Sequence, residues 1–474
     1  MKKVFFVIIL FTALLNLQAQ TSIEGNWGGN INIMGKQLGI FVHFVNESGS
    51  YSGTIDIPSQ GANGMRLSNI TIGKSMPESI LFTLEVPTAP ATFDGYYYMD
   101  DSLSGKFTQA GFEGTFLLTR VADKKEEKKE DKKESKTYKE EEVNFTNGDN
   151  YFAGTLTLPL TKGKHPAVIM ITGSGPQDRN EEIFGFKIFE IIADHFTKNG
   201  IAVLRYDDRN VGSSKGTPVS ESTSEDFAGD VIEAVKYLKT RSDINPNMIG
   251  LMGHSEGGMI APMVAVKMNN DLAFIVLMAG PAVTGSEIIK EQSRLINEAN
   301  GKYDEKENEE TQIFLDAMSG KISIDSLTTV MRSDVEKEYN DMSDEQKSQI
   351  KDKDAYIDGK VKAVISSFDN VWMKFFLKYD PRTALEKVTI PVLALFGGKD
   401  LQVPVKQNEA PMREALMKAG NTHYKIRTFD DANHLFQQAV SGSPNEYATL
   451  KKEFVPGFLE YITTWMLQYV TPTR

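Results

Sequence analysis

One short stretch combines a serine, a histidine and several glycines in a spacing that can do chemistry. It is NMIGLMGHSEGGMIAPMVAV, residues 247–266, in which Ser255 stands at the centre of a G-x-S-x-G pattern. The pattern is typical of a serine held on a sharp turn between a buried strand and a helix. Such a serine can attack an acyl carbonyl when a histidine accepts its proton. We therefore predict acyl-transfer chemistry with Ser255 as the nucleophile.

The pattern occurs twice, so its five letters alone do not identify the nucleophile. GSSKG, residues 212–216, places Ser214 at the equivalent position. Ser255 directly follows the apolar strand candidate MIGLMG and precedes an apolar helix candidate. Ser214 is separated from its strand by residues 208–210, and a proline follows where a helix would have to begin. We predict that Ser214 lies in a surface loop between a strand and a helix.

The base should be one of the six histidines, because a serine hydroxyl needs a positioned imidazole. If the groups follow the chain order serine, acid, histidine, only His423 and His434 lie late enough. His423 begins the strand candidate HYKIRTF, so we expect it at the edge of the sheet away from the nucleophile. His434, in DDANHLF, follows the other end of that strand and is the predicted base. We expect His254 to pack or to form a hydrogen bond beside the nucleophile.

The acid that orients the histidine is predicted at Asp400. In PVLALFGGKDLQVP this aspartate comes just past an apolar strand candidate, at the same edge of the sheet as the nucleophile. It could also merely cap the helix that begins near Pro404. Asp430 and Asp431 are rivals because they are near His434 in sequence. They lie on the same loop as the histidine, however, and would need a sharp reversal to reach its ring.

The elements that must position these groups alternate between strands and helices from residue 143 onward. The strand candidates are YFAGTLTLPL, PAVIMITG, IAVLRYD, MIGLMG, AFIVLMAG, PVLALFGG and YKIRTF. The helical patterns between them include Phe186–Lys198, Glu225–Lys239 and Val405–Ala419. Apolar strands that alternate with helices predict an α/β fold with a mostly parallel sheet covered on both faces.

Two further regions differ in composition from this core. Residues 285–379 are polar and helix-prone and contain no convincing strand, so we predict a helical cap inserted between core segments 143–284 and 380–474. Residues 21–122 contain short alternating runs separated by turn residues, which predicts a small β-barrel or sandwich. Residues 123–142, DKKEEKKEDKKESKTYKEEE, carry charges that nearly cancel and are predicted to be a solvated linker, helical in part.

Several segments together resemble the α/β-hydrolase superfamily. They are ITGSGPQDRNE, LRYDDRNVGSSKG, GLMGHSEGG, FGGKDLQVP and DANHLF. Within the superfamily they are similar to secreted bacterial serine carboxylesterases with an SGSGP-type oxyanion loop. The resemblance implies that the second G-x-S-x-G belongs to a D-x-R-G-x-G-x-S loop. Asn210 stands there where glycine is common, and asparagine adopts a positive φ less easily than glycine.

The resemblance and the geometry of the turn together place the oxyanion hole. One donor should be the backbone N–H of Glu256, the residue after the nucleophile. The other should be the N–H of Ser174, with Gln177 as an alternative. The charged residues Asp178, Arg179 and Arg209 are interpreted as a structural ion-pair network rather than as catalytic groups.

The substrate pocket is the least defined feature of the sequence. The end of the cap, FDNVWMKFFLKYD, contains Trp372, Phe375 and Phe376, which are candidates for lining an acyl pocket. Packing within the cap is the simpler explanation of the same residues.

Composition limits the compartment and the partners. The net charge of −12 argues against a nucleic-acid binder. The chain has no cysteine, which excludes a thiol nucleophile, a cysteine zinc site and disulfides.

Residues 1–20 combine Lys2-Lys3, an apolar run too short to span a bilayer comfortably and a small residue at Ala19. They predict a cleaved signal peptide and export to the periplasm or beyond, with no membrane span in the mature chain.

These observations imply a serine carboxylesterase that hydrolyses short-chain acyl esters of small molecules through Ser255, His434 and Asp400, without a metal or organic cofactor. The alternative is a serine peptidase of the same fold, of the aminopeptidase or oligopeptidase type. It would need an anchor for a peptide terminus, and no glutamate pair or arginine with that role is identifiable in the sequence. A non-catalytic binding protein is disfavoured because the three catalytic candidates and the glycine loop are all present. The sequence does not indicate an oligomeric state.

Overall fold

The structure is a computed structural model that describes most of the chain from residue 22 to residue 470. The described residues are 22–33, 36–47, 50–57, 62–73, 78–85, 90–98, 102–109, 112–121, 137–268, 271–301, 305–342, 344, 347, 350, 352–447 and 449–470. The predicted signal peptide and most of the predicted linker lie outside these residues. Among the described residues, no helix combines the length and apolar character that crossing a bilayer requires.

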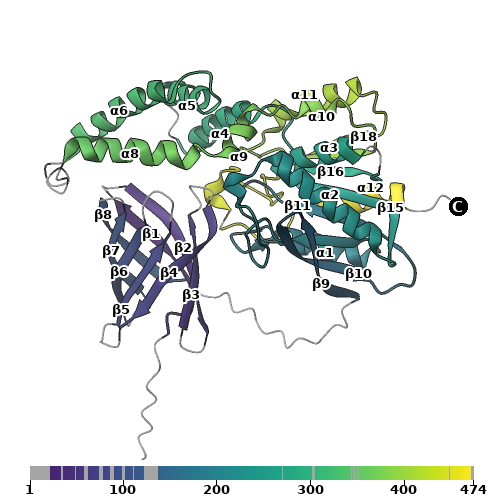
Figure 1. Ribbon diagram of the computed structural model, residues 1–474, viewed down its shortest axis with the longest axis horizontal. Coiled ribbons are helices and arrows are strands. Elements are labelled where there is room, and N and C mark those ends of the chain that lie inside the picture. The colour runs from purple at the N-terminus through teal and green to yellow at the C-terminus, as the bar shows by residue number, and fades with distance from the viewer. Residues whose placement is uncertain are drawn as a thin grey trace, which may run out of the picture.

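The N-terminal strands form a closed antiparallel barrel in which each strand pairs with its neighbour in sequence and β8 pairs with β1 (Figure 1). The strands are β1 (Gly25–Ile33), β2 (Lys36–Glu47), β3 (Ser50–Ile57), β4 (Ala62–Ile72), β5 (Glu78–Leu84), β6 (Ala91–Tyr98), β7 (Ser102–Gln109) and β8 (Phe112–Arg120). The sequence left a barrel and a sandwich open, and the structure is a barrel. Alternate residues point into the barrel, where the rings of Phe82 and Phe93 stack with their centroids 4.5 Å apart.

The second sheet has eight strands in the order β18-β17-β16-β15-β11-β14-β10-β9. The strands are β9 (Tyr138–Asn147), β10 (Asn150–Pro159), β11 (His165–Ile171), β14 (Ala202–Tyr206), β15 (Ile244–His254), β16 (Ile275–Met278), β17 (Val392–Gly397) and β18 (Tyr424–Phe429). The pairs β9–β10 and β10–β14 are antiparallel, and the other pairs are parallel. The predicted mostly parallel α/β sheet is confirmed.

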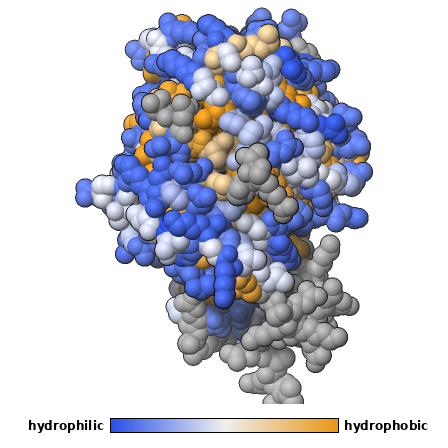
Figure 2. Space-filling view, turned by 90° about the vertical axis from the view of Figure 1, so that its right-hand side faces the viewer, coloured by the Kyte–Doolittle hydropathy of each residue, from blue (hydrophilic) through white to orange (hydrophobic). Residues whose placement is uncertain are grey.

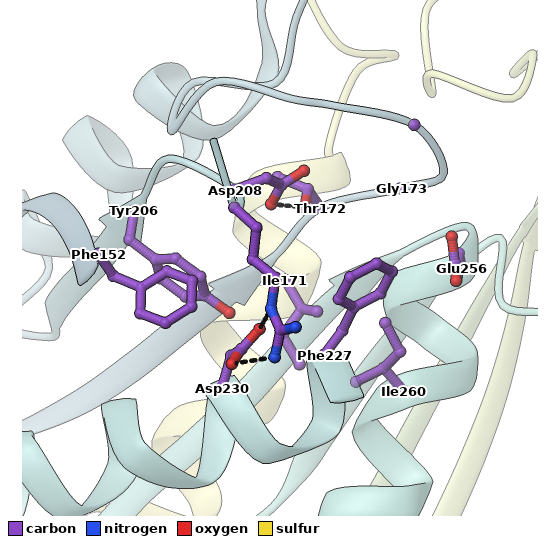
Figure 3. A pocket seen from close by; sticks show the side chains of 12 residues that line it. Phe152, Ile171, Thr172, Gly173, Tyr206, Asp208, Phe227, Asp230, Glu256 and Ile260 are labelled. Carbon is purple, nitrogen blue, oxygen red and sulfur yellow. Dashed lines mark hydrogen bonds and ion pairs between the residues drawn. The ribbon is translucent and has the colours of Figure 1, made fainter. Parts of the chain in front are cut away.

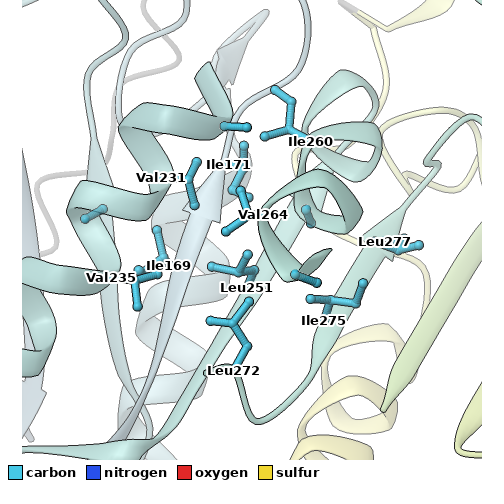
Figure 4. Close-up of a cluster of buried hydrophobic side chains, with 14 of the residues drawn as sticks. Ile169, Ile171, Val231, Val235, Leu251, Ile260, Val264, Leu272, Ile275 and Leu277 are labelled. Atoms are coloured by element: carbon cyan, nitrogen blue, oxygen red, sulfur yellow. The ribbon is translucent and has the colours of Figure 1, made fainter. Parts of the chain in front are cut away.

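Helices cover both faces of this sheet because its strands are apolar on both sides. On one face α2 (Ser224–Thr240) and α3 (Glu256–Met268) pack on side chains such as Ile169 and Ile171 (Figure 4). Helix α11 (Val405–Lys418) packs against β17 and β18. On the other face α1 (Ile188–Lys198) and α12 (Phe458–Val470) pack on the alternate residues Val168 and Met170. Hydrophilic residues cover most of the outer surface visible in Figure 2.

The structure corrects two boundaries in the predicted secondary structure. Strand β9 begins at Tyr138, inside the range predicted for the linker. Its buried residues Val143 and Phe145 alternate with exposed acidic and polar ones, so a charged sequence still forms an edge strand with one apolar side. Helix α1 begins at Ile188 rather than at Phe186, because the preceding residues form a hairpin of β12 (Glu182–Ile183) and β13 (Phe186–Lys187).

Helices alone fill the described part of the interval between β16 and β17. They are α4 (Gly285–Ala299), α5 (Glu305–Met318), α6 (Ile324–Asn340), α8 (Lys353–Phe368), α9 (Val371–Lys378) and α10 (Arg382–Leu385). In Figure 1 the pair α6 and α8 extends away from the sheet on the side where the barrel lies. The barrel meets the core where Phe41 on β2 lies edge-on to Phe184 at the tip of the β12–β13 hairpin, with ring centroids 6.2 Å apart.

Candidate active site

Ser255 lies on a strained turn between a strand and a helix. Strand β15 ends at His254 and α3 begins at Glu256, so the serine alone makes the connection, with a φ of +53°. Its N–H donates to the carbonyl of Met278 on the neighbouring strand at 2.8 Å. A Cβ on Gly257 would lie 2.2 Å from the carbonyl oxygen of Ile171, so only glycine fits there. A positive φ strains the backbone of a serine, and proteins retain such strain mostly at functional sites.

His434 and Asp400 meet at the same edge of the sheet. Asp400 follows the end of β17, and His434 follows the end of β18. The His434 Nδ1 donates to Asp400 Oδ2 at 2.8 Å, and both side chains are buried. Asp400 Oδ1 accepts the backbone N–H groups of Gln402 and Val403.

These contacts keep Asp400 ionised. Burial by itself would raise the pKa of Asp400. The charge and hydrogen bond of His434, together with the two backbone N–H groups, outweigh that effect and hold the pKa below its ordinary value. An ionised carboxylate on Nδ1 selects the tautomer in which Nε2 is free to accept a proton.

The serine and the histidine come from neighbouring positions of this edge. The ring of His434 lies 4.8 Å from the ring of His254, which directly precedes Ser255. Within the described residues no hydrogen bond joins the Ser255 hydroxyl to His434. Such bonds are often long in structures without substrate and tighten when substrate binds.

The loop after β11 carries the predicted oxyanion donors. The N–H of Gln177 donates to Asp208 Oδ2 at 2.9 Å, and the N–H of Gly173 donates to Glu181 Oε1 at 2.6 Å. Neither group is therefore available to a substrate. The N–H of Ser174 has no partner within the described part of the chain. Glu256 is the first residue of α3, where backbone N–H groups have no partner within the helix.

A small cavity of about 30 Å³ adjoins this loop (Figure 3). Its wall includes Gly173 and Glu256 and therefore borders the predicted oxyanion hole. Aromatic rings of Phe152 and Phe227 form part of the lining, together with the side chains of Asp208, Asp230 and Arg209. Burial raises the pKa of Asp208 well above its ordinary value, despite the hydrogen bonds that its carboxyl accepts.

The aromatic residues predicted for the substrate pocket lie elsewhere in the cap and do not line this cavity. Trp372 donates its indole N–H to Glu256 and stacks on Phe376 at 5.2 Å. Phe375 stacks on Tyr379 at 5.4 Å. The three residues therefore pack the base of the cap against the core, and Trp372 also binds Glu256 in the wall of the cavity.

The second G-x-S-x-G serine has structural contacts. Ser214 is buried, donates its hydroxyl proton to the carbonyl of Asp207 at 2.8 Å and accepts the N–H of Ala153 at 2.9 Å. The loop itself lies at the surface, as predicted, because Gly212, Ser213, Lys215 and Gly216 are exposed. Only the Ser214 side chain points inward, where these two bonds hold it against β10. Asn210 adopts a φ of +60°, the left-handed conformation that the glycine of the resembling motif would adopt more easily.

Two of the three charged residues predicted to form an ion-pair network, Arg179 and Arg209, form ion pairs, whereas Asp178 accepts backbone N–H groups. Arg179 binds Asp207 at 2.9 Å, and Arg209 binds Asp230 through two of its nitrogens at 2.6 and 2.8 Å. Asp178 accepts the backbone N–H of Asn180 at 2.9 Å. Within the described residues, no group of three or more histidine, aspartate or glutamate side chains could hold a metal ion.

The sequence did not reveal the buried partner of His254. Its Nδ1 lies 2.9 Å from Glu181 Oε1 and its Nε2 lies 3.0 Å from the carbonyl oxygen of His434. His254 was expected to pack or to form a hydrogen bond beside the nucleophile, and it forms two hydrogen bonds. Glu181 stands in a polar turn of the sequence, and no spacing rule connects it with a histidine 73 positions away.

Comparison with known proteins agrees with this architecture. A family model described as serine aminopeptidase, S33, matches residues 186–438, more than half of the chain. Esterase EstD of Thermotoga maritima is 28% identical over 354 residues, which cover 74% of this chain and 73% of that protein. Thiohydrolase aneE of Aspergillus aculeatus is 37% identical over 126 residues, which cover 27% of this chain and 36% of that protein.

Solved structures show a more distant likeness. The esterase Pf2001 of Pyrococcus furiosus is 14% identical, with a TM-score of 0.44 over 71% of this chain and 94% of that one. The α/β hydrolase GrgF of a Penicillium species is 16% identical, with a TM-score of 0.44 over 70% of this chain and 99% of that one. On the family match and the sheet topology, the chain belongs to the serine aminopeptidase S33 family of the α/β-hydrolase superfamily.

Proposed function

We propose that this protein is a serine esterase that hydrolyses short-chain acyl esters, with Ser255 as nucleophile, His434 as base and Asp400 as the orienting acid. The 2.8 Å bond between His434 and Asp400, at the edge of the sheet where Ser255 lies on its strained turn, carries the proposal. The name of the T. maritima relative, an esterase, supports ester hydrolysis.

The reaction proceeds in two halves. In the first, Nε2 of His434 takes the proton of Ser255 as its Oγ bonds to the acyl carbon. The resulting tetrahedral intermediate collapses when the ester C–O bond breaks, and His434 returns the proton to the leaving alcohol. In the second half His434 deprotonates a water molecule that attacks the acyl-enzyme, which releases the carboxylic acid and restores Ser255.

Two backbone donors receive the negative charge that develops on the carbonyl oxygen. We assign them to the N–H groups of Glu256 and Ser174. The N–H of Gln177, the alternative, already donates to Asp208 and would have to give up that bond. Loss of one such donor typically costs about 2.7–4 kcal/mol of transition-state stabilisation.

The cavity beside the oxyanion loop favours a small acyl group. The cavity is small, at about 30 Å³, and the rings of Phe152 and Phe227 form part of its wall. We therefore expect acetyl and propionyl esters to react faster than long-chain esters.

Aminopeptidase activity is the second candidate, and one feature of the cavity favours it. Asp208 and Glu256 line the cavity together with Arg209, and in their ionised forms the two carboxyl groups would suit the ammonium group of an aminoacyl substrate. The description of the family points in the same direction. In this case the same serine would cleave an amide, and the amine rather than an alcohol would leave.

The decisive experiment compares the two substrate classes on the mature protein. p-Nitrophenyl esters from acetate to laurate should be hydrolysed, fastest for acetate, and Ser255→Ala should abolish the activity. Ser214→Ala is the matched control, because it alters the other G-x-S-x-G serine. Cleavage of aminoacyl p-nitroanilides without ester turnover would favour the peptidase. Ester turnover that survives Ser255→Ala would refute the choice of nucleophile.

We also propose that the protein is exported, on the basis of the N-terminal sequence alone. Expression of the full chain with a C-terminal tag in a Gram-negative host should yield a processed protein in the periplasmic fraction, beginning near Gln20 or Thr21. An unprocessed N-terminus in the cytoplasmic fraction would contradict the proposal.

A further inference from the structure

A buried histidine and a buried glutamate lie directly behind the proposed catalytic groups. The His254 and Glu181 side chains are 2% and 1% exposed. The Glu181 carboxylate lies 2.9 Å from His254 Nδ1, and His254 Nε2 lies 3.0 Å from the backbone oxygen of His434. A carbonyl oxygen can only accept, so Nε2 carries a proton and donates it to the loop of the proposed base.

The same glutamate also holds the loop of the proposed oxyanion hole. Its Oε1 accepts the N–H of Gly173, the residue before Ser174, at 2.6 Å. Gly173 lies between the glutamate and the nucleophile, since a Cβ added to it would meet Glu181 Oε1 at 3.0 Å and Ser255 Cβ at 3.3 Å. One carboxylate oxygen therefore bonds to the oxyanion loop and to His254 at once.

We propose that His254 and Glu181 are positioning residues that hold the oxyanion loop and the His434 loop in fixed relation to Ser255. The inference rests on the proposed esterase function. His254 adjoins the nucleophile in the chain, binds the backbone of the base and shares the carboxylate that binds Gly173. The pair thus links three segments, at residues 173, 254 and 434, that meet only in the folded protein.

The energetics favour a paired, charged state. Burial alone would lower the pKa of His254, but the charge and hydrogen bond of Glu181, the carbonyl of His434 and the charge of Asp400 together raise it. An imidazolium can donate from both ring nitrogens, from Nδ1 to Glu181 and from Nε2 to the His434 carbonyl.

Two features of Glu181 mark a constrained position. The residue adopts a left-handed backbone with a φ of +47°. Its Oε2 is buried and has no hydrogen-bond partner among the described residues. Strain and an unsatisfied buried oxygen are both unfavourable, and native proteins retain such features mainly where function requires the geometry.

Amide substitutions separate the two bonds of His254. The amide nitrogen of glutamine can replace Nε2, so His254→Gln keeps the donor to the His434 carbonyl. Asparagine places its nitrogen near Nδ1, so His254→Asn keeps only the contact with Glu181. Glu181→Gln keeps an oxygen for Gly173, whereas Glu181→Ala removes it. His165→Gln is the matched control, since His165 is a buried histidine at the opposite end of β11.

The measurements are kcat and KM for p-nitrophenyl acetate, the rate of Ser255 labelling by a fluorophosphonate, and thermal unfolding of each full-length variant. Misplacement by about 1 Å can cost about 100-fold in rate. We expect His254→Asn and Glu181→Ala to lower kcat and the labelling rate by about that factor at nearly constant KM. His254→Gln, Glu181→Gln and His165→Gln should lose far less.

The outcomes distinguish this inference from the proposed function. Folded His254→Asn and Glu181→Ala variants that hydrolyse and label at the wild-type rate would overturn the inference alone. If either variant fails to fold, the double variant Glu181→Gln/His254→Asn, which buries no unpaired charge, takes its place in the same assays, and its full activity would overturn the inference. Wild-type protein that neither hydrolyses esters nor labels would overturn the proposed function and the inference with it.

Discussion

The indole N–H of Trp372 donates to both carboxylate oxygens of Glu256, over 2.9 and 3.1 Å. Trp372 belongs to α9 at the base of the cap, and Glu256 is the first residue of α3, next to the proposed nucleophile. Ser224, the first residue of α2, donates its hydroxyl to the same carboxylate at 2.5 Å. The cap is therefore attached to the core at the residue whose N–H we assign to the oxyanion hole.

Trp372→Phe should destabilise the protein by about 1–3 kcal/mol, because it leaves a buried acceptor with one donor fewer. The phenyl ring can retain part of the stacking on Phe376. Urea unfolding measures the effect, and Val371→Ala, at an exposed position of the same helix, is the control. A change below about 0.5 kcal/mol, the range of neutral surface substitutions, would show that the bond to Glu256 contributes little.

Glu256 should make stability depend on pH in a direction opposite to that of most acidic residues. Burial raises its pKa above the ordinary 4.5, and hydrogen bonds from Ser224 and Trp372 offset only part of the shift. The folded protein therefore binds this proton more tightly than the unfolded chain does. The stabilisation is fully present below pH 4.5 and is lost as the pH rises through the raised pKa.

Glu256→Gln removes this titration. We expect the free energy of unfolding of the variant, relative to that of the wild type, to increase as the pH rises from 4.5 to 8. Denaturant titrations at several pH values measure the difference. A difference that stays constant with pH would mean that Glu256 has the same pKa in the folded and unfolded protein, which would contradict the raised value.

Asp400→Asn should lower kcat for p-nitrophenyl acetate by about four orders of magnitude, the effect of the equivalent change in another serine hydrolase. The carboxamide retains the shape of the side chain but no longer selects the productive tautomer of His434. Asp431→Asn, on the loop of His434 itself, should remain near wild-type activity because Asp431 binds Lys399 at the surface. Equal losses in the two variants would reopen the choice of acid.

Arg209→Met should destabilise the protein by about 3–5 kcal/mol, since it leaves Asp230 buried without its partner. The two side chains are only 7% and 4% exposed. The double variant Arg209→Met/Asp230→Leu should regain much of this loss, because it removes both charges together. Thermal and denaturant unfolding test this, and a double variant no more stable than Arg209→Met would contradict it.

The sequence alone was sufficient to predict the structural features that depend on local residue patterns. Uninterrupted apolar strands predicted the two-sided sheet, and the polar interval before Tyr379 predicted helices alone between β16 and β17. The pattern did not reveal β9, because an edge strand needs an apolar residue only on one side and can carry charges on the other. The pattern also did not distinguish a barrel from a sandwich for the N-terminal strands, because a barrel closes only if the first strand pairs with the last.

For the site, the sequence by itself determined which residues were candidates. Ser255 stood out because a nucleophile on a strand-to-helix turn requires glycines at fixed positions, and His434 and Asp400 followed from the ends of their strands. Only the tertiary structure decided the contacts among distant segments: His434 with Asp400, Trp372 with Glu256, and His254 with Glu181. Such pairs depend on the side chains that packing brings within hydrogen-bonding distance, and spacing along the chain does not encode that distance.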